Sequence, residues 1–137
     1  MVARVRRKGQ SRRHRTGIAV MAPIPESIIS HQQSCVLELV YAQDKRYKLS
    51  YEFLRVHSPS AEVQGHGPGQ QVLQTGKREV RIHAIEPVGN YALKLVFSDG
   101  HDSGLYSWDL LYRFTQQYEA MWADYLKALQ AADASRD

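Results

Sequence analysis

Two polar, glycine-rich segments carry most of the side chains in this chain that could do chemistry. The first runs from Leu54 to Gly69 and the second from Val96 to Trp108. Both place histidine, carboxylate and hydroxyl groups among glycines and turn residues, and loops of this kind often present the working groups of a rigid fold. The binding surface that we predict from them consists of Ser58, Ser60, Glu62, Gln64, His66, Asp99, His101, Asp102 and Ser103.

Metal binding is the first chemistry that these side chains suggest. Imidazole and carboxylate groups suit zinc, iron and manganese, and the ligands that we predict are His101, His66, Glu62 and Asp99. Such a site requires both histidines to approach within about 4 Å of a shared point. The alternative is that Ser58 and Asp99 hydrogen-bond to backbone groups in turns, with His66 in solvent.

Nucleophilic catalysis is a weaker interpretation of the same segments. A nucleophile, a base and an orienting group could be drawn from Ser58, Ser60 or Ser103 with His101 and Asp102. No Gly-x-Ser-x-Gly nucleophile elbow is present, and adjacent residues of a strand point to opposite faces, which separates His101 from Asp102. We therefore predict no catalytic and no cofactor-binding residues, and no enzymatic activity.

Length and composition indicate one globular domain. The chain has 137 residues, of which 43% are hydrophobic, enough to build one core. No apolar run approaches the ~20 residues that span a bilayer, so we expect no membrane contact. Cys35 is the only cysteine, which excludes an intrachain disulfide and fits a reducing, cytoplasmic compartment.

Positive charge is concentrated at the amino terminus. Seven of the 18 lysines and arginines lie in the first 15 residues, which leaves 11 basic against 14 acidic residues in the remainder. We predict a basic, disordered tail over residues 1–22 and a single domain over residues 23–137. The domain itself does not suggest a nucleic-acid partner, although the tail could contact phosphate. Met21 could also be the natural start.

Hydrophobic periodicity predicts the elements that must position the polar segments. Residues 26–31 could form one helical turn, and the alternation over residues 35–50 is typical of a β-hairpin. Ser50 can cap a short helix over residues 51–56, and His57 can contact the terminal carbonyls of that helix. No hydrophobic period survives over residues 58–76, and so long a loop is often functional.

The second half of the chain is predicted to contain three strands and a helix. Strands alternate over residues 80–85 and 93–98, and Asp99-Gly100 favours a tight turn into a returning strand over residues 101–108. Apolar residues from Leu111 to Leu129 then recur every three or four positions, which predicts a helix, with a break near Thr115. The fold class that we predict is α+β: a small antiparallel sheet of about five strands packed against a carboxy-terminal amphipathic helix.

Three stretches of this sequence resemble a known family. YEFLRVHSPSAEVQGHGPGQ, QTGKREVRIHAIEPVGNYALKLVFSDGH and SGLYSWDLL are similar to the stand-alone bacterial domain of unknown function that is related to the amino-terminal domain of gamma-butyrobetaine hydroxylase. In that hydroxylase the domain precedes the oxygenase domain and is not the catalyst. The resemblance therefore implies a binding domain, and no oxygenase activity is transferred.

The resemblance also implies a metal site that this sequence alters. The hydroxylase domain binds zinc through three cysteines and one histidine. The cysteine positions fall here on Ser58, Ser60 and Val63, and the histidine position falls on His101. Hydroxyl groups are poor zinc ligands and valine is none. One zinc or iron ion could still bind if Glu62 and His66 supplied substitute ligands.

From these observations we predict a non-enzymatic binding module linked to iron or iron–sulfur metabolism. A similar domain fused to iron–sulfur cluster carrier ATPases implies a protein partner of iron–sulfur or oxygenase chemistry. Two alternatives stay open at this point. One is a metal-dependent enzyme that uses Glu62, His66 and His101, and the other is a metal-free adaptor for protein interaction.

Overall fold

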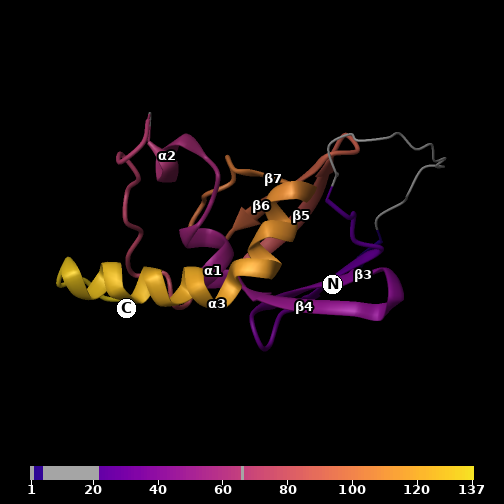
Figure 1. The fold of residues 1–137 in the computed structure, drawn as a ribbon, viewed down its shortest axis with the longest axis horizontal. Helices are drawn as coiled ribbons and strands as arrows, with labels where there is room; N and C mark the ends of the chain where they lie inside the picture. The colour runs from indigo at the N-terminus through magenta and orange to yellow at the C-terminus, as the bar shows by residue number, and fades with distance from the viewer. Residues whose placement is uncertain (1, 5–21, 66) are drawn as a thin grey trace.

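The computed structural model describes residues 2–4, 22–65 and 67–137, which form two small antiparallel sheets and a long carboxy-terminal helix (Figure 1). The first sheet has the order β1-β2-β3-β4 and the second the order β5-β6-β7. The α+β class, the antiparallel pairing and the carboxy-terminal helix predicted from the sequence are confirmed. The difference is that the strands divide between two sheets.

The first sheet contains the predicted hairpin. Strands β3 (Val36–Tyr41) and β4 (Lys45–Ser50) pair in register from Val36↔Ser50 to Tyr41↔Lys45. Strand β2 (Ser27–His31) pairs with β3, and β1 (Val2–Arg4) pairs with β2 at the edge. Residues 5–21 of the predicted tail lie outside the described residues, so its disorder stays a prediction.

The predicted helical turn over residues 26–31 is wrong, because this segment is β2. Ile28 and Ser30 point into the protein and alternate with partly exposed neighbours. That is the period of two expected of a half-buried strand, and Ile28 lies opposite Leu39 of β3 in the core. The pairing available along β3 outweighs the weak local preference of a six-residue segment for a helix.

The second sheet is a meander, as the order of its sequence signals predicts. Strands β5 (Ile82–Val88) and β6 (Ala92–Phe97) pair from Ile82↔Phe97 to Val88↔Ala92, with a register shift between Ile82 and Ala84. Strand β7 (Leu105–Ser107) pairs with β6 over three residues only. The expected turn at Asp99-Gly100 is present, with Gly100 at φ +88°. Residues 101–104 do not join the strand and follow a separate path toward the long loop.

Three α-helices and the 3-10 helix η1 (Ala42–Asp44), which joins β3 to β4, complete the described fold. Helix α1 (Tyr51–Val56) begins at Ser50, whose hydroxyl accepts the Phe53 N–H at 3.0 Å as the sequence predicts. Helix α2 (Ala61–Gln64) is a single turn inside the loop that was expected to lack structure. Helix α3 (Trp108–Ala131) is continuous. The break predicted near Thr115 is wrong, because its hydroxyl donates to the Tyr112 carbonyl within the helix.

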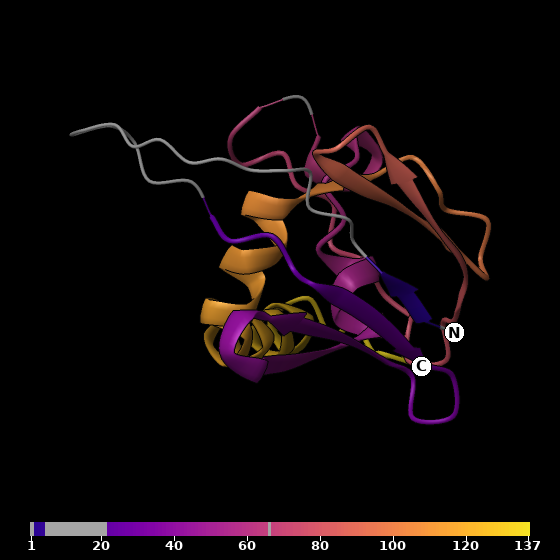
Figure 2. The same ribbon diagram turned by 90° about the vertical axis from the view of Figure 1, so that its right-hand side faces the viewer.

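One core joins the two sheets, α1 and the first half of α3. Its largest fully buried side chains include Tyr51, Phe53, Phe97, Tyr106 and Phe114. Helix α3 contacts β4 and β7, and its carboxy-terminal half extends beyond the sheets beneath the loop that carries α2 (Figures 1 and 2). A second, smaller cluster packs Val56 of α1 against Tyr125 and Leu129 in this half of α3. None of the helices in the described ranges combines the length and hydropathy needed to cross a bilayer.

Candidate functional site: a histidine clamp beside an apolar groove

His101 holds the long loop against the turn between β6 and β7. Its Nε2 lies 2.8 Å from Ser58 Oγ and 3.3 Å from Ser60 Oγ, and its Nδ1 lies 2.9 Å from Glu62 Oε1. Ser58 is 0% exposed, and Ser60 and His101 are each 6% exposed. Four of the residues singled out in the sequence therefore meet, and we call Ser58, Ser60, Glu62 and His101 the histidine clamp.

The protonation state of His101 follows from its surroundings. Burial, and then the nearby Arg55 charge, lower the pKa of His101 more than the Glu62 carboxylate raises it. The imidazole is consequently neutral at pH 7. Since Glu62 can only accept a hydrogen bond, Nδ1 carries the proton and donates to it. Nε2 is then the acceptor, to which the serine hydroxyls donate.

The clamp has the residue order of a proton relay, but its serine hydroxyl is buried. Serine, histidine and carboxylate lie in sequence along one hydrogen-bonded line, as nucleophilic catalysis requires. The hydroxyl of Ser58 has no solvent exposure, and it also accepts the Ser60 N–H at 3.3 Å. This oxygen is therefore not presented to solvent. The arrangement fixes the start of the loop on the second sheet.

Asp99, the remaining predicted metal ligand of the hairpin, takes part in a different network. Its Oδ2 accepts hydrogen bonds from Arg55 Nε at 2.9 Å and Lys77 Nζ at 2.6 Å, and its Oδ1 accepts the His101 N–H. Burial acts to raise the pKa of Asp99, but the hydrogen bonds from Lys77, His101 and Arg55 outweigh it and lower the pKa to about 2. Both carboxylate oxygens are thus engaged.

The other predicted surface residues of the described part of the chain make no hydrogen bond to His101. Gln64 Nε2 donates to the Ser58 carbonyl at 2.9 Å. Asp102 and Ser103 are exposed, and the nearest cation to Asp102 is Lys94 at 3.8 Å. His66 lies outside the described residues, so its role as a ligand stays a prediction.

The donor set does not fit the zinc site that the family resemblance implies. Ser58 and Ser60 converge on His101 as the implied ligand positions should, but they do so as hydrogen-bond donors. Val63, at the third position, is 3% exposed and packs as a core side chain. Across residues 22–65 and 67–137, no group of three histidine, cysteine or carboxylate side chains could hold a metal ion. We therefore derive no chemistry from a metal here.

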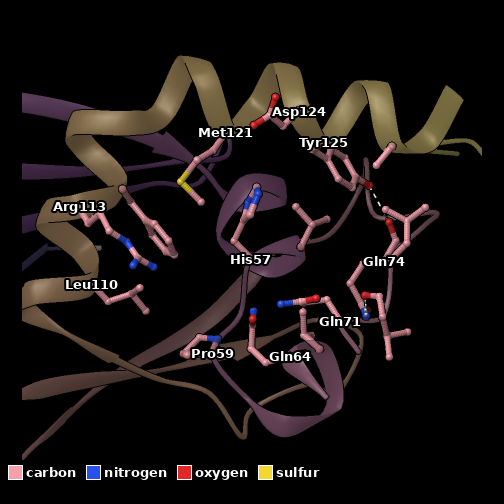
Figure 3. Close-up of a pocket in the computed structure, with 16 residues that line it drawn as sticks. His57, Pro59, Gln64, Gln71, Gln74, Leu110, Arg113, Met121, Asp124 and Tyr125 are labelled. Atoms are coloured by element: carbon pink, nitrogen blue, oxygen red, sulfur yellow. Dashed lines mark hydrogen bonds between the residues drawn. The ribbon is translucent and has the colours of Figure 1, made fainter. Parts of the chain in front are cut away.

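An apolar groove of about 940 Å³ lies next to the clamp (Figure 3). One wall is α3, from Leu110 to Ala128, and the other is the loop, with Val63, Gln64 and residues 71–74. The α3 side chains in the groove recur every three, four or seven positions along one face of the helix: Leu110, Phe114, Met121, Tyr125 and Ala128. Three amide side chains line the loop side: Gln64, Gln71 and Gln74.

His57 forms the floor of the groove beneath α3 (Figure 3). As predicted, it contacts a helix carbonyl, with Nδ1 2.9 Å from Phe53 O, and its ring lies 4.3 Å from the Phe53 ring. Burial lowers the pKa of His57 despite this hydrogen bond, so the neutral ring donates through Nδ1. Nε2 is left as an acceptor in a mainly apolar groove, with no partner among the described residues.

Both ends of the groove's loop wall are anchored. The clamp holds its start, at Ser58 to Glu62. Toward its end, the Gln74 side chain accepts from Arg55 Nη1 at 3.1 Å, and the Gln74 carbonyl accepts from Tyr125 Oη at 2.8 Å. Binding surfaces that are ordered beforehand lose less conformational entropy when a ligand arrives. The polar groups singled out in the sequence therefore fix the position of the loop that forms one wall of the groove.

The sequence interpretation missed the groove because it assigned the α3 stripe to the core. One signal was available. A 24-residue helix is about 36 Å long, whereas a six-residue strand spans about 20 Å. The apolar stripe of α3 therefore had to extend beyond the sheets, where the sheets could not cover it.

Comparison with known proteins places these features in a family. The model of the family described as "Gamma-butyrobetaine hydroxylase-like, N-terminal" matches residues 28–112. Among curated proteins there is no match. A protein solved by NMR in solution is 54% identical, over 85% of this chain and 92% of its own, with a TM-score of 0.75. A second NMR structure is 46% identical, over 93% of this chain and 91% of its own, with a TM-score of 0.72.

A crystal structure extends the likeness to a more distant protein. It is a protein of unknown function from Acidithiobacillus ferrooxidans that belongs to the DUF971 family. It is 36% identical, over 66% of this chain and 91% of its own, with a TM-score of 0.56. The family match covers the clamp, α1, α2 and the second sheet, and it ends at the start of the groove-lining part of α3. This chain therefore belongs to the gamma-butyrobetaine hydroxylase-like, N-terminal family.

Proposed function

We propose that this domain is a non-enzymatic, metal-free interaction module that binds a polypeptide segment of a partner protein in the groove. The observation that carries the proposal is the groove of about 940 Å³ between α3 and the anchored loop. Its volume lies in the range of specific ligand sites. Its lining combines an apolar helix face with amides that can pair with a peptide backbone.

The chemistry of the groove favours binding over catalysis. Its charged lining residues, Arg113 and Asp124, are both exposed. The histidine clamp does not line the groove, and its serines and His101 are buried, whereas Glu62 is exposed. Neither the clamp serines nor His57 forms a nucleophile and base pair open to solvent. The partner that the sequence suggests, a protein of iron–sulfur or oxygenase chemistry, stays part of this proposal.

Selection from a random 12-residue peptide library, displayed on phage, tests the proposal directly. We expect peptides that bind the wild-type protein and lose binding to Ala128→Trp, which fills the groove from α3. Ala123→Trp is the matched control, because Ala123 is exposed on the same helix and does not line the groove. Selected peptides that bind Ala128→Trp as well as they bind Ala123→Trp would contradict the proposal.

A second variant guards against an effect of Ala128→Trp on folding. Val72 lies on the opposite wall and is 53% exposed, so Val72→Asp should fold normally and should also weaken binding. Thermal unfolding of each variant checks this.

Two further measurements address the alternatives. Binding should be unchanged by a chelator, and elemental analysis of untagged protein should find no stoichiometric zinc or iron. A fluorophosphonate probe should not label Ser58. Labelling at Ser58, or metal-dependent binding, would favour the enzymatic or metal-binding alternatives instead.

A further inference from the structure

The charged groups of the groove indicate the chemistry of the segment that it binds. Arg113 lies at one end of the groove beside Leu110, and Asp124 lies further along α3 beside Tyr125 (Figure 3). Both are exposed. Neither forms an ion pair within the described part of the chain. The apolar groove thus has one unpaired charge of each sign along its α3 side.

The spacing of these charges sets the spacing of their complements. Arg113 and Asp124 are 11 positions apart in α3, which corresponds to about 16 Å along the helix axis. An extended peptide covers that distance in about five residues. Between the two charges the groove presents Phe114, Met121 and the His57 floor, which favour an apolar side chain.

We propose, building on the proposed function above, that the groove binds an extended segment of mixed charge. In this segment an acidic residue pairs with Arg113, a basic residue about five positions away pairs with Asp124, and apolar side chains between them lie over His57. Exposed complementary charges contribute little affinity each, but they select the partner and suppress like-charged competitors. The neutral His57 Nε2 and the Gln71 amide make no hydrogen bond within the described part of the chain, and both can pair with polar groups of the bound segment.

Three synthetic peptides test this inference. They share an apolar centre and carry, five positions apart, one glutamate and one lysine, two lysines, or two glutamates. Fluorescence anisotropy of labelled peptides measures their affinities. Wild-type protein should bind the mixed-charge peptide best, with a preference of roughly fivefold over each of the others at low salt. The preference should shrink in high salt, because the charges are exposed.

Charge reversal in the protein should change the preference in a defined way. Arg113→Glu should bind the two-lysine peptide best, and Asp124→Lys should bind the two-glutamate peptide best. This pattern does not depend on the direction in which the peptide lies in the groove. Glu119→Lys is the control, because Glu119 is exposed on α3 outside this groove, and it should keep the wild-type preference.

The outcomes separate this inference from the proposed function. If the wild type and both charge-reversal variants bind the three peptides equally, and Ala128→Trp abolishes that binding, the groove binds peptides but does not select charge. The inference is then overturned, and the proposed function stands. If none of the three peptides binds, or if Ala128→Trp leaves binding intact, the inference is overturned as well. The library selection then decides separately whether the groove binds any polypeptide.

Discussion

Gly104 lies directly against Ser58, so that no side chain fits between them. A Cβ atom at position 104 would overlap Ser58 Oγ and would lie 3.1 Å from Pro59 Cδ. Glycine at this position lets residues 101–104 leave the second sheet and approach the loop. The approach brings Ser58 within hydrogen-bond distance of His101, and the clamp depends on it.

Gly104→Ala should therefore destabilise the protein. The added methyl group meets a fully buried hydroxyl, and overpacking of this kind costs about 1–3 kcal/mol. Urea unfolding measures the loss. In the double variant with Ser58→Ala, part of the loss should be recovered, because the clashing oxygen is gone. Gly67→Ala is the control, since a Cβ there meets nothing within 4 Å, and it should leave stability nearly unchanged.

His101→Gln should weaken the fold most at neutral and alkaline pH. The substitution disturbs hydrogen bonds to two buried serines, a loss of about 2 kcal/mol. In the wild type the folded-state pKa of His101 lies below its ordinary value of about 6.5. The unfolded chain therefore takes up the proton first, and the contribution of His101 is complete above about pH 6.5 and is lost as the pH falls toward the folded-state pKa.

The pH dependence provides the measurement for that variant. The gap in unfolding free energy between wild type and His101→Gln should narrow between pH 7.5 and pH 5. His83→Gln serves as the control, because His83 is exposed on β5, and it should change neither stability nor its pH dependence. A gap of constant size across this range would contradict a neutral, buried imidazole in the clamp.

Local patterns in the sequence predicted most of the elements, because those elements satisfy local rules. The Ser50 cap, the β3–β4 hairpin and the turn at Gly100 depend on neighbouring residues alone. Ser27–His31 was misassigned because its strand pairing comes from residues further along the chain. Likewise, Thr115 does not interrupt α3, because its hydroxyl has a carbonyl partner inside the helix.

The candidate site was accessible from the sequence only in part. The approach of the loop containing Ser58 to the turn containing His101 was predicted, since both segments carry matched polar groups. Which side chains meet could not be predicted, because that depends on the close approach that Gly104 permits by having no side chain, and on the single turn of α2. The groove required knowledge of where the sheets end along α3, which is a tertiary relationship.

Arg136→Met should destabilise the protein by stranding a buried carboxylate. Glu52 in α1 is 6% exposed, and Arg136 donates to both of its oxygens, at 2.7 and 2.9 Å. Removing one partner of such a pair costs about 3 kcal/mol, because the remaining charge is left in a site of low polarity. Methionine keeps an apolar stem near the Trp122 ring, over which the guanidinium lies.

The double variant Glu52→Gln with Arg136→Met distinguishes this mechanism from a general effect at the carboxy terminus. It should be more stable than Arg136→Met alone, because no buried charge remains. Arg78→Met is the control, since Arg78 pairs with exposed Asp137 and exposed pairs contribute less than about 1 kcal/mol. Chemical denaturation of the wild type, Glu52→Gln, Arg136→Met and the double variant gives the coupling energy, and additive losses would count against the pairing.

Asp99→Asn should destabilise the fold at neutral pH by about 1 kcal/mol, after allowance for solvent screening of a partly exposed group. Asp99 pairs with Arg55 of α1, which precedes the loop wall of the groove, and with Lys77, which follows it. Its charge therefore links the two ends of that wall. Its pKa is lowered from about 3.8 to about 2. The stability that it contributes is therefore present above about pH 4 and is lost as the pH falls toward 2. Asp102→Asn is the matched control, since Asp102 is exposed and has only a distant contact with Lys94. Acid unfolding should show the gap between wild type and Asp99→Asn closing below pH 4, whereas Asp102→Asn should follow the wild type throughout. A gap that persists at pH 2 would mean that asparagine disturbs packing, and that the ion pairs with Arg55 and Lys77 do not hold the wall.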